Sequence, residues 1–161
     1  MNHKVEPFND FGVALGKLKV APENVFCFVP ENFGEAKTST DFIYPESVTD
    51  IRKVLKSANI KIGFLADDKP LLRARKFADW FGPTLFIGFS FLAENSDLIS
   101  VSLNLISSYL YDVFKGNCSG KNVKFDIIIE TKEKKEYTKL SYDGNIEGMK
   151  ELGNIIKQLK K

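Results

Sequence analysis

Apolar and polar positions follow two different periods along the chain, and the period identifies each predicted element. The unbroken apolar run VFCFV, at 25–29, is flanked by prolines and is typical of a buried strand. Shorter apolar runs predict further strands at 42–44 and 60–65. None of these short runs shows the spacing of a helix, so the pattern indicates a sheet in the first half of the chain.

A period of two returns near the C-terminal end. The segments 123–131 and 136–142 alternate in polarity and are separated by KEKK, which predicts an antiparallel hairpin. One side of its first strand collects four apolar residues, and we expect that side to be buried: Val123, Phe125, Ile127 and Ile129.

Helical spacing occurs in four segments. Ser47 and Asp50 form a capping box before a predicted helix that ends near Asn59. Further helices are predicted over 70–81, over 98–114 with Asp97 as its cap, and over 146–159 with Asn145 as its cap. The phenylalanine-rich segment 83–93 fits helix or strand, and a proline at its start favours helix.

The helix predicted over 98–114 has two contrasting sides. One side is apolar, whereas the other carries small, uncharged polar residues in place of the lysine and glutamate of an ordinary exposed helix. That side is either covered by the same domain or is an interface for another protein. The interface candidates are Ser100, Asn104, Ser107, Ser108 and Tyr111.

These elements predict an α+β fold in a single domain of residues 1–161, with a small, mostly antiparallel sheet covered by three or four helices. Because strands alternate with helices early in the chain, a mixed α/β sheet is the alternative. Residues 1–22 show neither period and are expected to form an arm or an irregular lead-in.

Charge and composition narrow the possible partners. The formal charge is +2, from 23 basic and 21 acidic residues spread along the chain, so nucleic acid is not indicated. No apolar segment is long enough to predict a membrane span. The two cysteines, Cys27 and Cys118, lack a paired spacing, and with no secretory signal pattern at the N-terminus they indicate a cytoplasmic protein.

Common catalytic motifs are missing from the sequence. His3 is the only histidine and lies in the predicted arm, so imidazole-based catalysis and histidine metal sites lack their central residue. Neither of the usual glycine-rich phosphate-binding patterns occurs. We therefore expect a protein that is not an enzyme and that needs no cofactor.

Two alternative functions remain open. A small-ligand sensor would use a phenylalanine-rich pocket near the loop 30–40, and its candidate lining residues are Trp80, Phe86, Phe89 and Phe91. A carboxylate-dependent metal enzyme would use Asp67 and Asp68, which follow an apolar strand and could supply oxygen ligands to a divalent ion.

Four segments carry a resemblance to a known family: VTDIRKVLKSA, LISVSLNLISSYLYDVF, VKFDIIIETKEKKEYTKLSYDG and IEGMKELGNIIKQLKK. Together, over about residues 48–161, they resemble the small effector-associated proteins of bacterial conflict and defence systems, in particular the short constant component that couples a sensor to an effector. The resemblance implies a bacterial adaptor without a catalytic site. We expect it to act through a protein partner or through self-association.

Overall fold

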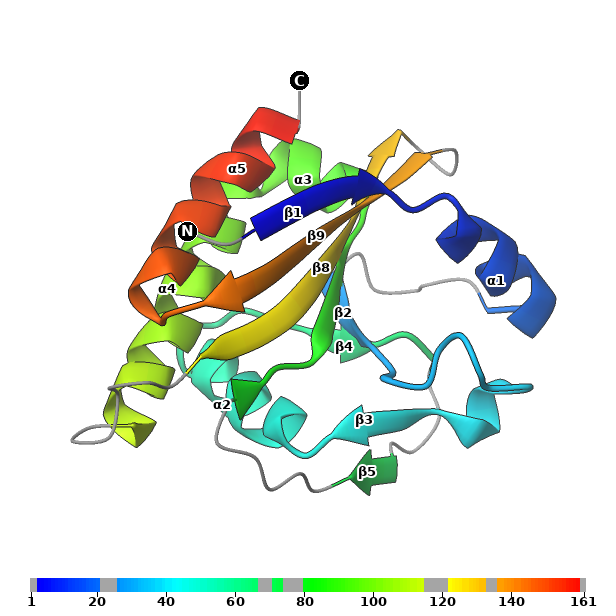
Figure 1. Cartoon of the computed structure of the whole chain (residues 1–161), viewed down its shortest axis with the longest axis horizontal. Coiled ribbons are helices and arrows are strands. Elements are labelled where there is room, and N and C mark those ends of the chain that lie inside the picture. Colours follow the sequence, from blue (N-terminus) through cyan, green and yellow to red (C-terminus); the bar gives the residue numbers. More distant parts are fainter. Residues whose placement is uncertain are drawn as a thin grey trace.

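A mixed β-sheet is the centre of the computed structural model, which describes residues 3–20, 26–66, 71–73, 80–114, 122–132 and 136–159. Within these residues, seven strands form the main sheet, in the order β1-β9-β8-β7-β2-β4 with β6 also paired to β8 (Figure 1). Their bounds are β1 His3–Pro7, β2 Phe26–Val29, β4 Gly63–Phe64, β6 Trp80–Phe81, β7 Thr84–Ile87, β8 Val123–Lys132 and β9 Glu136–Gly144. A small separate sheet pairs β3 (Ile43–Pro45) with β5 (Leu71–Arg73) in parallel.

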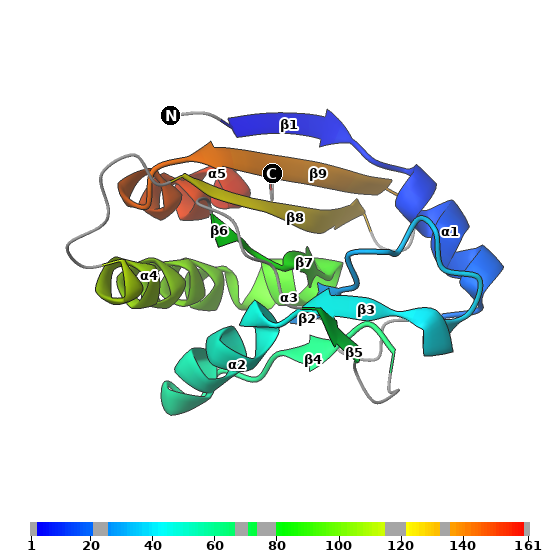
Figure 2. The ribbon, with the colours of Figure 1, turned by 60° about the horizontal axis from the view of Figure 1, so that its bottom comes forward.

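Most of the helices lie together on one side of the main sheet (Figure 2). They are α2 (Ser47–Ser57), α3 (Phe89–Glu94), α4 (Ser96–Val113) and α5 (Leu152–Leu159), and the short 3-10 helix η2 (Glu147–Glu151) precedes α5. Helix α1 (Asp10–Leu18) and the 3-10 helix η1 (Ser39–Asp41) complete the described elements. The α+β class is thus confirmed, and the parallel pairs β2–β4, β7–β8 and β6–β8 make the sheet mixed, the alternative that the sequence left open.

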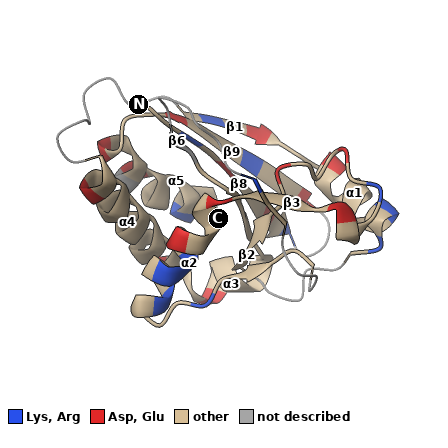
Figure 3. Cartoon of the chain, turned by 90° about the horizontal axis from the view of Figure 1, so that it is seen from below, with Lys and Arg blue, Asp and Glu red and all other residues tan. Residues whose placement is uncertain are grey.

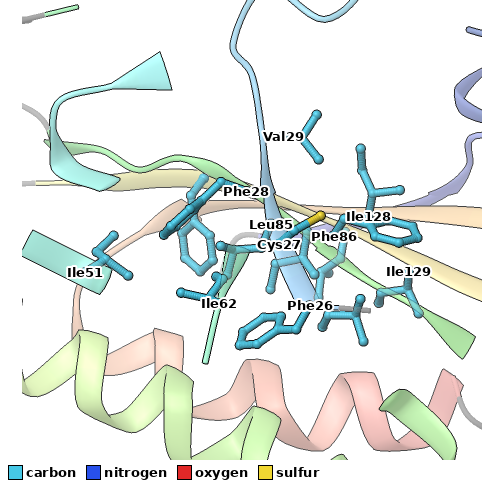
Figure 4. Close-up of a cluster of buried hydrophobic side chains, with 14 of the residues drawn as sticks. Phe26, Cys27, Phe28, Val29, Ile51, Ile62, Leu85, Phe86, Ile128 and Ile129 are labelled. Atoms are coloured by element: carbon cyan, nitrogen blue, oxygen red, sulfur yellow. The ribbon is translucent and has the colours of Figure 1, made fainter. Parts of the chain in front are cut away.

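The core extends over both faces of the sheet because successive side chains of a strand point to opposite faces. Phe26 of β2 stacks on Phe91 of α3, with ring centroids 5.1 Å apart, on the side covered by the four helices. On the opposite side, Phe86 of β7 stacks on Phe11 of α1 at 5.4 Å. Figure 4 shows side chains from β2, β7 and β8 gathered around this central part of the sheet.

The predicted C-terminal hairpin is confirmed. Strands β8 and β9 pair antiparallel along most of their length, with a register shift between Glu130 and Lys132. The four residues expected on the buried side of the first strand are at most 7% exposed: Val123, Phe125, Ile127 and Ile129. Asn145 accepts a hydrogen bond from the Gly148 N–H at 2.8 Å, so it caps the last helical segment as predicted.

Two predictions of local structure are wrong, and one segment that the sequence left open contains both kinds of element. Residues 3–20 are not an irregular arm, because β1 pairs with β9 and the Phe11 side chain is fully buried. In the predicted helix 70–81, the described parts are strands β5 and β6, which pair with distant segments. Segment 83–93, for which helix and strand were both open, divides into β7 and α3, because 84–87 lie between β2 and β8 in the sheet.

The capping box before α2 does not form either. Helix α2 already includes Ser47, and its N-cap residue Glu46 makes no side-chain capping bond. Asp50 instead accepts a hydrogen bond from the Tyr109 hydroxyl of α4, at 2.9 Å. The Asp50 carboxylate, which the local pattern assigned to a helix cap, therefore joins two helices instead.

Candidate functional site

One side of α4 packs against its own chain. Six residues of the helix are buried, at three- and four-residue spacing: Ile99, Ser102, Leu103, Ile106, Ser107 and Leu110. The Ser107 hydroxyl donates to the carbonyl oxygen of Ile146 at 3.2 Å, which links α4 to the segment that leads into η2. The Ser102 hydroxyl donates to the Leu98 carbonyl at 2.7 Å, one turn earlier in the same helix. Both buried serine hydroxyls are therefore satisfied within the chain.

Small residues allow α4 and α5 to approach closely. A Cβ atom added to Gly153 of α5 would lie 2.6 Å from Ser100 Oγ and 3.3 Å from Ser100 Cα. Such distances are closer than ordinary van der Waals contact, so the packing requires a glycine at 153 and a small residue at 100. Ser100 thus lies at the contact between the two helices.

The opposite side of α4 is open to solvent. Leu98, Val101 and Tyr111 are 38%, 43% and 54% exposed, Asn104 and Ser108 are also exposed, and Leu105 is half-buried. Their spacing of three or four residues places them along one face of the helix. We name this face the α4 stripe, defined as Leu98, Val101, Asn104, Leu105, Ser108 and Tyr111.

The α4 stripe carries no charged side chain. In the whole of α4 only Asp97 and Asp112 are charged, one near each end of the helix. Asp97 is paired with Lys157 of α5, with 3.0 Å between Oδ1 and Nζ. Figure 3 shows the contrast with α2, whose exposed positions include Arg52 and Lys53. The stripe is therefore a neutral, partly apolar surface with the Asp97–Lys157 ion pair near one end and Asp112 near the other.

A hydrogen bond marks the edge of the stripe that adjoins α2. The Tyr109 hydroxyl donates to Asp50 Oδ2 at 2.9 Å. Burial, together with the hydrogen bond to Asp50 and its negative charge, raises the pKa of Tyr109 to about 12. Because the phenol stays protonated at neutral pH, it remains a donor that holds α2 beside α4.

The structure divides the predicted interface residues into two groups. Asn104, Ser108 and Tyr111 lie on the exposed α4 stripe, whereas Ser107 is 2% exposed and Ser100 packs against Gly153. The prediction is therefore wrong for Ser107, because its own chain covers that side chain. The neutral polar side of the helix is thus covered by the chain itself over one part of its circumference and exposed over another.

Leu98 and Val101 were missed as members of this surface. The helical pattern groups Leu98 with the apolar side of the helix. The only sequence signal for Val101 is its spacing of three residues from Leu98 and from Asn104. Exposure alone identifies them, since a branched apolar side chain on a helix is usually a core residue.

The three aromatic pocket candidates whose side chains are described do not come together. Phe86 is 3% exposed and packs toward α1, Phe91 stacks on Phe26 on the other face of the sheet, and Phe89 is 37% exposed. The side chain of Trp80 lies outside what the structure describes. The sheet itself thus separates two of the residues that were expected to line one pocket.

The candidate metal ligands Asp67 and Asp68 lie outside the described residues. Among the residues that are described, no group of three or more histidine, cysteine, aspartate or glutamate side chains could hold a metal ion. Cys27 is fully buried, and burial raises the pKa of its thiol to about 12, so this thiol stays protonated and unreactive at neutral pH.

Two further findings concern membrane spans and the comparison with known proteins. In the part of the chain that the structure describes, no helix combines the length and apolar character needed to cross a membrane. No family model, curated protein or solved structure matches the sequence or the fold.

Proposed function

We propose that this protein is a non-enzymatic interaction component that binds another protein through the α4 stripe. The observation that carries the proposal is the exposed side of α4, which carries no charge from Leu98 to Tyr111, in a chain in which 27% of residues are charged. Exposed helix faces normally carry many charged side chains. Covering this one would remove three exposed apolar side chains from water, and no charge of the stripe itself would be desolvated.

The chemistry of the α4 stripe specifies the kind of partner. Its centre has small side chains at Val101, Asn104 and Ser108, which permit close approach, and Tyr111 supplies an aromatic anchor near one end. Asp112, four residues beyond Ser108, favours a basic residue on the partner, whereas Asp97 is already paired with Lys157. A helix with an apolar face and one basic flank fits these features.

The resemblance of residues 48–161 to effector-associated constant components supports the same class of function. Those proteins act by connecting other proteins, and the segment LISVSLNLISSYLYDVF, one of the four that carry the resemblance, contains the α4 stripe. We accordingly assign the protein to a bacterial defence or signalling system, as a component that couples a sensor to an effector.

A paired-variant binding experiment tests the proposal. Val101→Glu and Ser108→Glu place a carboxylate on the stripe, and Val13→Glu places one on α1, where Val13 is 59% exposed. Proteins retained from the source cell by each tagged variant would be compared by quantitative mass spectrometry, and each candidate would be produced and titrated in pure form. We expect one partner whose affinity falls about tenfold or more with each stripe variant, because a carboxylate would be buried unpaired against it.

The control separates a specific surface from a general effect of charge. Val13→Glu should bind that partner as the wild type does, and all three variants should unfold at similar temperatures because every substituted residue is exposed. The proposal fails if every purified partner binds both stripe variants with wild-type affinity.

A further inference from the structure

Strand β1 has one free side among the described residues. It pairs antiparallel with β9 from His3 opposite Tyr142 to Pro7 opposite Thr138, and no other described strand pairs with it (Figure 1). An unpaired strand side presents backbone donors and acceptors to solvent and can accept a further strand. The side chains of β1 indicate which strand would fit.

The direction of the backbone groups of β1 follows from one hydrogen bond. The N–H of Phe8 donates to the Tyr137 carbonyl at 2.8 Å, so it points toward β9. Backbone groups of successive residues point to alternate sides of a strand, and those of Val5 therefore point outward. Pro7 also occupies an outward position, where its missing N–H costs no bond to β9.

The side chains of β1 carry opposite charges on either side of Val5. Lys4 and Glu6 lie on the same face and form an ion pair, with 3.2 Å between Nζ and Oε2. Val5 lies on the other face, where it is 40% exposed. A strand that runs antiparallel to β1 would need a negative residue opposite Lys4 and a positive residue opposite Glu6.

We propose that β1 pairs antiparallel with β1 of a second copy of this chain, about a twofold axis at Val5. This register places Lys4 opposite Glu6 of the second copy and Glu6 opposite Lys4 of the second copy. The two Val5 residues exchange both backbone hydrogen bonds, and each His3 N–H can donate to the Pro7 carbonyl of the second copy. The charge order of the strand is thus complementary to itself.

The existing sheet extends this charge complementarity. Glu6 is opposite Lys139 of β9, and Lys139 Nζ is 3.9 Å from Asp126 Oδ2 of β8. The signs alternate from Asp126 through Lys139 to Glu6, and Lys4 of the second copy would continue the alternation. Strands with a different charge order would meet like charges or an unpaired charge, so the same residues disfavour other partners.

The dimer would leave the α4 stripe uncovered. A twofold axis perpendicular to the sheet keeps the two helical layers on the same side, and β1 and α4 are different surfaces (Figure 2). The inference therefore does not depend on the proposed function. A dimer would present two copies of the stripe, which raises the avidity for a partner with two binding sites.

A charge-swap experiment tests the pairing. Wild type, Lys4→Glu, Glu6→Lys and an equimolar mixture of the two variants would be compared by sedimentation velocity at about 100 μM, where a dimer with a Kd in that range is about half populated. We expect the wild type to dimerise and each variant alone to dimerise at least about tenfold more weakly, because each substitution changes two symmetry-related pairs. The mixture should recover the dimer, since the two acidic side chains of one variant face the two basic side chains of the other.

Two further variants distinguish pairing from unfolding and from a general change of charge. Val5→Pro removes the outward N–H and should abolish the dimer. Lys17→Glu on α1 changes the net charge by the same amount as Lys4→Glu and should leave the dimer intact. Circular dichroism would verify that each variant is folded. A monomeric wild type, a dimer that tolerates Val5→Pro, or a mixture that is no more dimeric than its components would overturn the proposal.

Discussion

The same substitution at two neighbouring serines of α4 should greatly lower the stability at one position and leave it nearly unchanged at the other. Ser107 is 2% exposed and donates to the Ile146 carbonyl, whereas Ser108 is exposed on the α4 stripe. Ser107→Glu would bury a carboxylate with no basic partner, at a cost of about 3–5 kcal/mol. For a chain of this size that lowers the melting temperature by about 6–20 °C.

Ser108→Glu should change the stability by no more than about 0.5 kcal/mol, or about 2 °C. The better helix propensity of glutamate offsets its repulsion from Asp112, four residues later. Ser107→Ala should lower the stability by an intermediate amount, about 1 kcal/mol. The loss is moderate because the Ile146 carbonyl also accepts a hydrogen bond from the Met149 N–H and so keeps one partner. Thermal and chemical denaturation followed by circular dichroism would measure all three. Equal stability of the two glutamate variants would refute the assignment of the buried and exposed sides of α4.

Three further predictions concern packing and ionisation. Gly153→Ala should destabilise the fold by about 1–3 kcal/mol, because the added Cβ would lie 2.6 Å from Ser100 Oγ; adding Ser100→Gly should recover part of that loss in chemical denaturation. Tyr109 has a folded pKa of about 12 against an ordinary 10, so its contribution to stability is complete below about pH 10 and is lost as the pH rises through 12. Denaturation at a series of alkaline pH values should show that the free energy of unfolding falls less with rising pH for Tyr109→Phe than for the wild type. Cys27 should resist alkylation near neutral pH in a folded Cys118→Ser variant and react once the chain unfolds; rapid labelling of the folded variant would contradict its burial.

The elements that the sequence predicts well are those whose partners are close in sequence. Strands β8 and β9 alternate in polarity and are separated by a short turn, so their pairing follows from the local pattern. β1 pairs with residues more than 130 positions later, and a local pattern carries no information on such a partner. The strand at 71–73 forms for the same reason, through its pairing with β3, although its apolar spacing resembles a helix.

The candidate site was predicted in part. The unusual neutral side of α4 was evident from its serine and asparagine residues, and Asn104, Ser108 and Tyr111 are exposed as an interface requires. Helical spacing alone could not separate them from Ser107, because a segment 39 residues later supplies the carbonyl that Ser107 contacts. The sequence predicts the helix and the order of residues around its axis. Contacts with distant segments determine which of those residues are buried.

Photo-cross-linking from the α4 stripe tests the central claim most directly. A photoreactive amino acid would replace Ser108 in one protein and, as the control, Val13 in another, and both would be irradiated in the source cell. We predict an adduct from position 108 that mass spectrometry identifies as a different protein, and that excess unlabelled wild type suppresses but the Val101→Glu variant does not. No adduct at position 108, adducts only with further copies of this chain, or equal suppression by the two competitors would contradict the account.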